Sequence, residues 1–134
     1  MPGFIFQHVV QPRYAETDQG GRIHHSAYVP WIEEARIGFL HQQGVAYAQV
    51  EAAGYFLIVR HIELRYRRPI QFGSAVSIET RIEKQGHASL TFAYTLSQQD
   101  VLCAEAHTEL ACVDRQGKPT VLPENLKSAL AKLS

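Results

Sequence analysis

The sequence predicts an α+β protein in which a curved antiparallel β-sheet wraps around one long central α-helix. Hydrophobic residues recur at helical spacing over residues 26–43, as in an amphipathic helix. After Gly54, hydrophobic and polar residues alternate with period two, which is typical of half-buried strands. The breaks between these strands are too short for a crossover helix, so neighbouring strands should be antiparallel. A helix on the hydrophobic face of such a sheet completes a layered α+β arrangement.

The N-terminal half should hold a strand, a loop and the long helix. Hydrophobic residues at even spacing predict a strand over residues 4–14. Residues 17–22 are polar and glycine-rich, and predict a loop. The long helix carries Pro30 in its first turn, where a missing backbone donor is tolerated, and should end near Gly44.

The C-terminal half should hold the sheet and the short helices. Helical spacing predicts one short helix over residues 46–53 and another over residues 123–133, the latter ending with Leu133. The strands are expected to pair in chain order as a meander, and they cover residues 61–67, 76–83, 90–97 and 103–113.

Length and charge limit the functions that the chain can perform. Its 134 residues are expected to form a single domain over residues 1–134. The 13 Lys and Arg balance the 13 Asp and Glu, so the broad positive field of nucleic-acid and membrane-surface binders is missing. No signal peptide or membrane span is recognisable, which predicts a cytoplasmic protein. A small partner, and a pocket completed by a second copy of the chain, fit these limits best.

The two cysteines, Cys103 and Cys112, are interpreted as ordinary strand residues. Their odd separation within one strand should point them to opposite faces of the sheet, which excludes a disulfide within that strand. Two cysteines are also too few for a structural zinc site.

Reactive residue types gather in the loop that precedes the long helix: Tyr14, Glu16, Asp18, His24 and His25. A helix start offers unpaired backbone donors and a partial positive charge, which can stabilise an oxyanion. A nearby carboxylate could attack a carbonyl or deprotonate water. Spacing alone favours a simpler role for Asp18, that of a turn-forming residue, as loop aspartates beside glycines commonly are.

Metal and cofactor chemistry are not predicted. Asp18, His24 and His25 could in principle bind a metal, but adjacent histidines point apart and the i, i+4 histidine pair of metalloprotease helices is missing. Nucleophilic-serine, P-loop and dinucleotide-binding motifs are also missing from the sequence.

Residues 14–28 (YAETDQGGRIHHSAY) and 31–36 (WIEEAR) closely resemble the signature of the 4-hydroxybenzoyl-CoA thioesterase family of hot-dog fold proteins. Residues 66–70 (YRRPI) and 72–74 (FGS) also match this family. The resemblance covers nearly the whole chain, and it implies the hot-dog fold, in which a curved antiparallel sheet wraps around a long helix.

The resemblance implies an acyl-CoA thioesterase without a cofactor. Asp18 would be the nucleophile or general base, and the backbone amide of His25 would form the oxyanion hole. A thiol leaving group, with a pKa of about 8.5, departs as thiolate and needs little acid assistance. The site would lie between subunits of a homo-oligomer, a dimer or tetramer, with Glu33 reaching the acyl pocket from the partner's helix. The substrate-binding residues so implied are His24, Tyr28, Glu33, Ile58, Val59 and Arg60.

The chain departs from the benzoyl-specific members at residues 85–88 (QGHA), where a basic run would help to hold the nucleotide. Lys84, Arg60 or Arg65 would then have to supply that contact. Two other interpretations stay open: an acyl-thioester hydratase or dehydratase on the same fold, and a non-catalytic acyl-thioester binding module. The first lacks sequence support, because the Asp-x-Asn-Pro-x-His pattern of hot-dog hydratases is missing.

Overall fold

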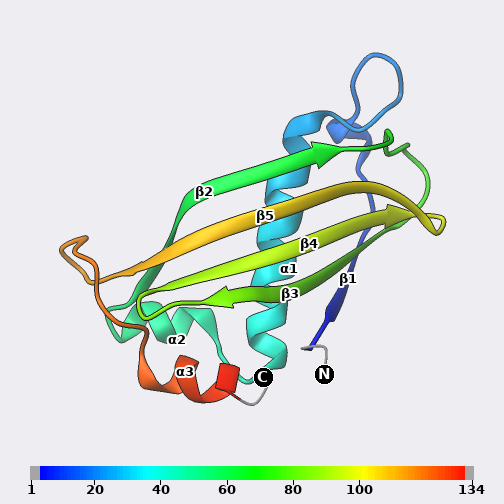
Figure 1. Ribbon diagram of the computed structural model, residues 1–134. Helices are drawn as coiled ribbons and strands as arrows, with labels where there is room; N and C mark the ends of the chain where they lie inside the picture. Colours follow the sequence, from blue (N-terminus) through cyan, green and yellow to red (C-terminus); the bar gives the residue numbers. More distant parts are fainter. Residues whose placement is uncertain (1–3, 132–134) are drawn as a thin grey trace.

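The computed structural model describes residues 4–131, which form a five-stranded antiparallel sheet with a long helix, α1 (Tyr28–Gln42), lying across one face (Figure 1). The strand order in the sheet is β1-β3-β4-β5-β2, so β1 and β2 are its edges. The strands are β1 (Phe6–Val10), β2 (Phe56–Tyr66), β3 (Val76–Gln85), β4 (Ser89–Gln98) and β5 (Val101–Val113).

The ends of α1 follow from local chemistry, as the sequence predicts. A 3-10 turn, His25–Ala27, leads directly into the helix. Pro30 falls in the first helical turn, where its missing N–H costs no hydrogen bond. After Gln42 the chain reaches Gly44 with φ +85°, a left-handed conformation that glycine adopts without strain.

The core lies between α1 and the concave face of the sheet. Ile32, Ala35 and Phe39 of α1 are at most 1% exposed, and they share one face of the helix. The Phe39 ring meets the Phe92 ring of β4 edge to face, with centroids 5.6 Å apart. Each fully buried side chain of this size stabilises the fold by roughly 1.5–3 kcal/mol. This packing fixes the position of the helix start on the sheet.

The predicted N-terminal strand is too long. β1 ends at Val10, and residues Tyr14–Glu16 instead form a 3-10 turn. Pro12 explains the difference, because it has no backbone N–H to donate to a neighbouring strand. The predicted short helices are confirmed as α2 (Tyr47–Ala52) and α3 (Glu124–Ala131), although Leu133 lies outside the described residues.

The predicted four-strand meander is wrong in one connection. β3, β4 and β5 pair in chain order, but β2 pairs with β5 at the far edge and not with β3. The segment 67–75 therefore passes over two strands at one end of the sheet (Figure 1). That step is about 14 Å at the usual strand spacing, which an extended segment of this length spans easily. The buried Gln98 side chain holds the segment, because its amide donates to the carbonyls of Gln71 and Ser74.

The two cysteines do not lie on opposite faces as predicted. Both are unpaired and buried, with Cys103 2% and Cys112 0% exposed. Leu96 pairs with Ala104 while Ser97 pairs with Leu102, so Cys103 is the extra residue of a β-bulge. The bulge shifts the inside–outside alternation by one residue, which the sequence pattern does not reveal.

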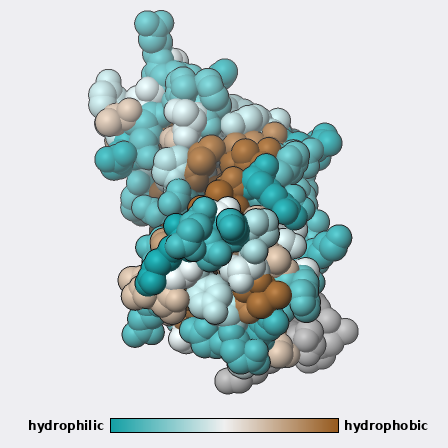
Figure 2. Space-filling model, turned by 90° about the vertical axis from the view of Figure 1, so that its left-hand side faces the viewer, coloured by the Kyte–Doolittle hydropathy of each residue, from teal (hydrophilic) through white to brown (hydrophobic). Residues whose placement is uncertain are grey.

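The edge strand β2 is far more exposed than the sequence pattern suggests. Ile62 and Tyr66 pair with Thr108 and Ala104 of β5, and so lie on the same face of the sheet as the core, as predicted. They are nevertheless 40% and 49% exposed, because α1 does not cover this edge. Figure 2 shows hydrophobic residues gathered in the middle of one side of the molecule, surrounded by hydrophilic ones. Exposed hydrophobic residues of β2 and α1 are Ile58, Val59, Ile62, Val29 and Ile37.

Candidate active site

Residues 17–23 form a small closed hairpin in front of the long helix. Thr17 and Ile23 form an antiparallel bridge, and the Asp18 amide donates to the Arg22 carbonyl at 2.7 Å. Gly21 turns the chain at φ +80°, which confirms the predicted glycine-dependent loop. Asp18 lies exposed on this hairpin.

The Asp18 carboxylate uses only one of its oxygens to shape the hairpin. Oδ1 accepts hydrogen bonds from the amides of Gly20 at 2.8 Å and Arg22 at 3.1 Å. Asp18 therefore does form the turn, as spacing alone suggests. In the part of the chain that the structure describes, Oδ2 accepts no hydrogen bond. The carboxylate is thus held in one orientation and keeps one oxygen open for chemistry.

His25 stands at the first position of the 3-10 turn that leads into α1. Its backbone amide donates to no acceptor within residues 4–131, as expected at a helix start. Its carbonyl accepts a hydrogen bond from the Tyr66 hydroxyl at 3.1 Å. Tyr66 ends β2, so the far edge of the sheet holds this turn in place. Sequence reasoning missed this role of Tyr66, because no local pattern connects residues so far apart.

His24 caps the same turn. Its Nδ1 accepts from the Ser26 amide at 3.1 Å and lies 2.8 Å from the Ser26 hydroxyl. The His24 and His25 rings lie with their centroids 4.1 Å apart, and both side chains are exposed. The contacts of His24 are those of an N-cap residue. Its predicted part in binding the substrate stays a prediction.

Tyr28 is 2% exposed, so the structure places it beneath the helix start and not on an open surface. Its ring meets the Tyr66 ring edge to face at 5.0 Å. Burial raises the pKa of Tyr28 to about 12, with a smaller opposing effect from the backbone of Ile70. The hydroxyl therefore stays protonated near neutral pH.

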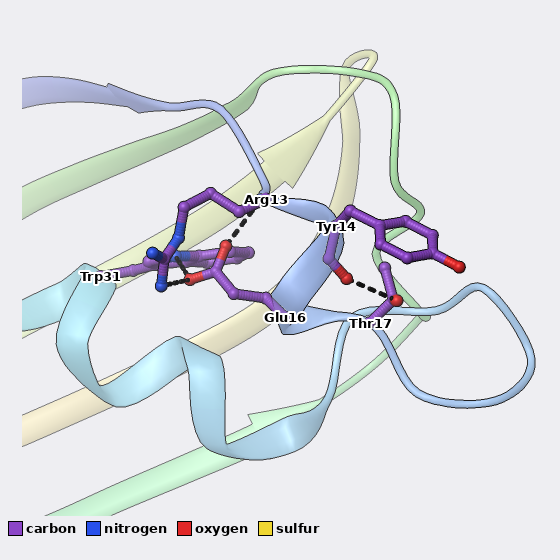
Figure 3. Close-up of polar contacts among 5 residues, drawn as sticks. All are labelled: Arg13, Tyr14, Glu16, Thr17 and Trp31. Carbon is purple, nitrogen blue, oxygen red and sulfur yellow. Dashed lines mark hydrogen bonds and ion pairs between the residues drawn. The ribbon is translucent and has the colours of Figure 1, made fainter.

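The sequence marks Glu16 only as one of several reactive residues, yet its carboxylate is the centre of a polar cluster (Figure 3). It accepts from the backbone amide of Arg13 at 2.7 Å and from the indole N–H of Trp31 at 3.0 Å. The spacing of Arg13 and Glu16 matches the N-terminal capping pattern of a helix, which could have identified the first contact. Tyr14 points away from this cluster and is 77% exposed.

Glu33 and Ile58 border a cavity of about 230 Å³ between α1, α2 and β2. Asp18 and His25 are not among its lining residues, and neither are Val59 and Arg60. Ile58 lies near the start of β2, and Tyr66 at its end contacts His25. At the usual rise of a strand, Ile58 and Tyr66 are separated by roughly 25 Å. One chain therefore does not bring Glu33 and Ile58 to the predicted catalytic residues.

Two of the three cations predicted to hold the nucleotide already have carboxylate partners. Arg60, the extra residue of a bulge in β2, donates through Nε to Glu109 at 3.0 Å, and Arg65 lies 3.7 Å from Glu63. Lys84 contacts no carboxylate among the described residues. Over residues 4–131 there is no cluster of histidine, cysteine and acidic residues able to hold a metal ion. Nor is any helix in that range long and hydrophobic enough to cross a bilayer.

The five-stranded antiparallel sheet and the long helix that crosses it are the hot-dog fold of thioesterases. The chain belongs to the thioesterase-like superfamily, whose family model matches residues 12–130. It is 28% identical to the acyl-CoA thioester hydrolase YbgC of Escherichia coli over 124 residues, covering 91% of this chain and 92% of that one.

Solved structures show the same likeness. The protein TT1821 of Thermus thermophilus matches with a TM-score of 0.91 and 37% identity, over 96% of this chain and 98% of that one. The DHNA-CoA thioesterase of Staphylococcus aureus matches with a TM-score of 0.91 and 28% identity, over 96% and 89% of the chains. The predicted family, hot-dog fold and thioester-hydrolase class are thereby confirmed.

Proposed function

We propose that this protein hydrolyses acyl-CoA thioesters to a free acid and CoA, with Asp18 as the nucleophile or general base and the His25 backbone amide as the oxyanion donor. Thioester hydrolysis follows from the family and from the names of the relatives. One observation carries the residue assignment. The anchored Asp18 carboxylate lies on a hairpin that leads directly to His25, and neither its Oδ2 nor the His25 amide has a hydrogen-bond partner among residues 4–131.

The reaction needs only these two groups and water. Asp18 attacks the thioester carbonyl, or removes a proton from a water that attacks it. The carbonyl oxygen gains negative charge, which the His25 amide and the helix start stabilise. The C–S bond then breaks and CoA leaves as the thiolate. If Asp18 has taken a proton from water, it passes that proton to the thiolate or to solvent, which restores the carboxylate. If Asp18 attacks directly, an acyl anhydride forms and a water molecule hydrolyses it, which restores the carboxylate.

A second copy of the chain would complete the site. The edge of β2 offers unpaired backbone groups along a strand with exposed hydrophobic residues, which suits antiparallel pairing with another β2. A two-fold axis near Ile62 would place Ile58 of one chain opposite Tyr66 of the partner subunit. Since Tyr66 contacts His25, this arrangement brings the cavity at Glu33 and Ile58 toward the partner's Asp18 hairpin. We therefore propose a dimer as the smallest active unit.

Release of free thiol from a panel of acyl-CoA substrates tests the proposal. Asp18→Asn should lower kcat by about 100-fold or more while the variant still binds the substrate. His25→Ala should keep most of the activity, because the backbone amide remains. An unchanged rate in Asp18→Asn would exclude the carboxylate as the reacting group. Substrate binding without any thiol release by the wild-type protein would instead favour the non-catalytic binding module.

A further inference from the structure

We infer that Glu16 is a positioning residue, which sets the Asp18 carboxylate relative to the His25 amide by tying the hairpin to helix α1. The inference rests on the proposed function, because it assigns Glu16 a role only through Asp18 and His25. It concerns a residue that need not touch the substrate, since its side chain is 12% exposed.

The Glu16 carboxylate links two elements that are separate in the sequence. Oε1 accepts from the Arg13 amide at 2.7 Å, and Oε2 accepts from the Trp31 indole at 3.0 Å (Figure 3). Trp31 is 3% exposed and lies in the first turns of α1. The Arg13 guanidinium, 3.6 Å from Oε2, adds a favourable charge. The segment that enters the hairpin is thereby bonded to the rigid start of the helix.

The backbone of Glu16 makes a third link, to the other end of the hairpin. Its carbonyl accepts from the His24 amide at 2.7 Å, next to the proposed oxyanion donor at His25. Asp18 follows Glu16 by two residues, and Thr17 also donates its hydroxyl to the Tyr14 carbonyl at 2.7 Å. Glu16 thus holds both proposed reacting groups: it precedes Asp18 by two residues, and its carbonyl binds the amide next to that of His25.

Catalytic geometry is sensitive to such support, because a misplacement of about 1 Å can cost about 100-fold in rate. A carboxylate suits this position because each of its oxygens accepts a different N–H donor. Glutamine has the same length but only one acceptor oxygen, so its NH₂ group would face one of the two donors. The loss of geometry should therefore appear already in Glu16→Gln, without removal of side-chain volume.

The wild type is first assayed with hexanoyl-CoA and with benzoyl-CoA. The test then measures kcat and KM for thiol release from whichever of the two it cleaves faster. Glu16→Gln should lower kcat about tenfold or more and leave KM within about threefold. Trp31→Phe, which removes one donor, should lower kcat less, and the two changes together should cost less than the product of their separate effects. Glu34→Gln is the matched control. Glu34 lies on α1, as Trp31 does, but it pairs with His8 at 3.4 Å and not with the hairpin. Its replacement should therefore leave kcat unchanged.

A background lacking the Asp18 carboxylate separates positioning from a general loss of structure. In Asp18→Asn, adding Glu16→Gln should lower the residual rate by a much smaller factor than it lowers the wild-type rate, since only the His25 amide remains to be positioned. If the residual rate is below detection, amide exchange decides: residues 17–25 should exchange faster in Glu16→Gln than in the wild type.

The outcomes separate the two proposals. A kcat of Glu16→Gln equal to that of the wild type, or unchanged exchange of residues 17–25, would overturn the role of Glu16 while leaving Asp18 in place. A further equal loss in the Asp18→Asn background would show a merely structural effect and overturn it too. An Asp18→Asn variant with full activity would remove the proposed role of Asp18 and, with it, the group that Glu16 is inferred to position.

Discussion

Asp18 and Tyr28 show how single residues near the helix start depart from their simplest interpretation. Asp18 makes the turn-forming hydrogen bonds that spacing alone suggests, but only through Oδ1. Tyr28, which the family resemblance implies as a substrate contact, is buried against Tyr66 and Trp31. Its environment therefore affects stability as well as the shape of the site.

Alkaline pH should destabilise the protein partly through Tyr28. Burial raises the pKa of this hydroxyl from 10.0 to about 12, so above pH 10 the unfolded state loses the proton first. The protonated Tyr28 hydroxyl makes its full contribution to the free energy of unfolding below about pH 10, and this contribution is lost as the pH rises toward about 12. By about pH 11 this loss is about 1 kcal/mol of unfolding free energy.

Urea unfolding at about pH 9 and about pH 11 measures this effect. The decrease in stability between the two values should be smaller by about 1 kcal/mol in Tyr28→Phe than in the wild type. Burial also raises the pKa of Tyr47 and Tyr94, so the variant should retain part of the alkaline sensitivity. Equal decreases in the two proteins would contradict the assignment to Tyr28.

At the scale of elements, the β4–β5 hairpin is the clearest case of local strain. Gln98 pairs with Val101, so Gln99 and Asp100 alone make the turn. Both have positive φ, 52° and 63°, as in the type I′ turn that matches the twist of antiparallel strands. Neither residue is glycine, although the second position of this turn favours it.

Asp100→Gly should therefore stabilise the fold by about 0.5–1 kcal/mol, after allowance for the greater freedom of glycine in the unfolded chain. Thermal or urea unfolding measures the change. Asp100→Ala is the control, since it removes the same carboxylate without relieving the backbone. An equal gain in both variants would mean that charge, and not the positive φ, sets the cost of this turn.

For the whole molecule, the central question is how the cavity at Glu33 and the hairpin at Asp18 come together. They lie toward opposite ends of β2 in one chain. The proposed pairing of two β2 edges resolves this separation and covers the exposed Ile58, Val59 and Ile62. In this pairing Ile62 of one chain lies opposite Ile62 of the partner subunit across the two-fold axis, which suggests a direct test.

Ile62→Glu should separate the dimer and abolish thiol release, because like charges directly opposite each other destabilise paired strands. Sedimentation or size-exclusion chromatography with light scattering measures the oligomeric state alongside activity. Val9→Glu is the matched control on the other edge strand, where Val9 is 57% exposed, and it should change neither property. A dimeric and active Ile62→Glu protein would place the interface elsewhere.

Prediction from the sequence succeeded where local chemistry decides the structure. The alternation of β4, with Leu90, Phe92, Tyr94 and Leu96 all buried, is visible in the residues themselves. The position of Pro30 and the stop at Gly44 are equally local. Asp18 and His25 could be singled out because a carboxylate loop before a helix start has a chemical meaning, and the family resemblance then gave each a role.

Other features depended on contacts between distant residues. Period-two patterns define which face of a strand is buried but not which strand is its neighbour, so the position of β2 beside β5 could not be read from them. The bulge at Cys103 and the exposure of Ile62 also depend on the partner strand and on where the helix ends.

The sequence by itself determined the helix, the strands, the loop that carries Asp18 and the family of this protein, because these depend on hydrophobic period, on turn chemistry and on a contiguous motif. Only the tertiary structure decided the strand order, the hydrogen bond from Tyr66 to His25 and the hydrogen bond from Trp31 to Glu16. Those features join residues that are far apart in the chain, and their partners are chosen by packing around α1.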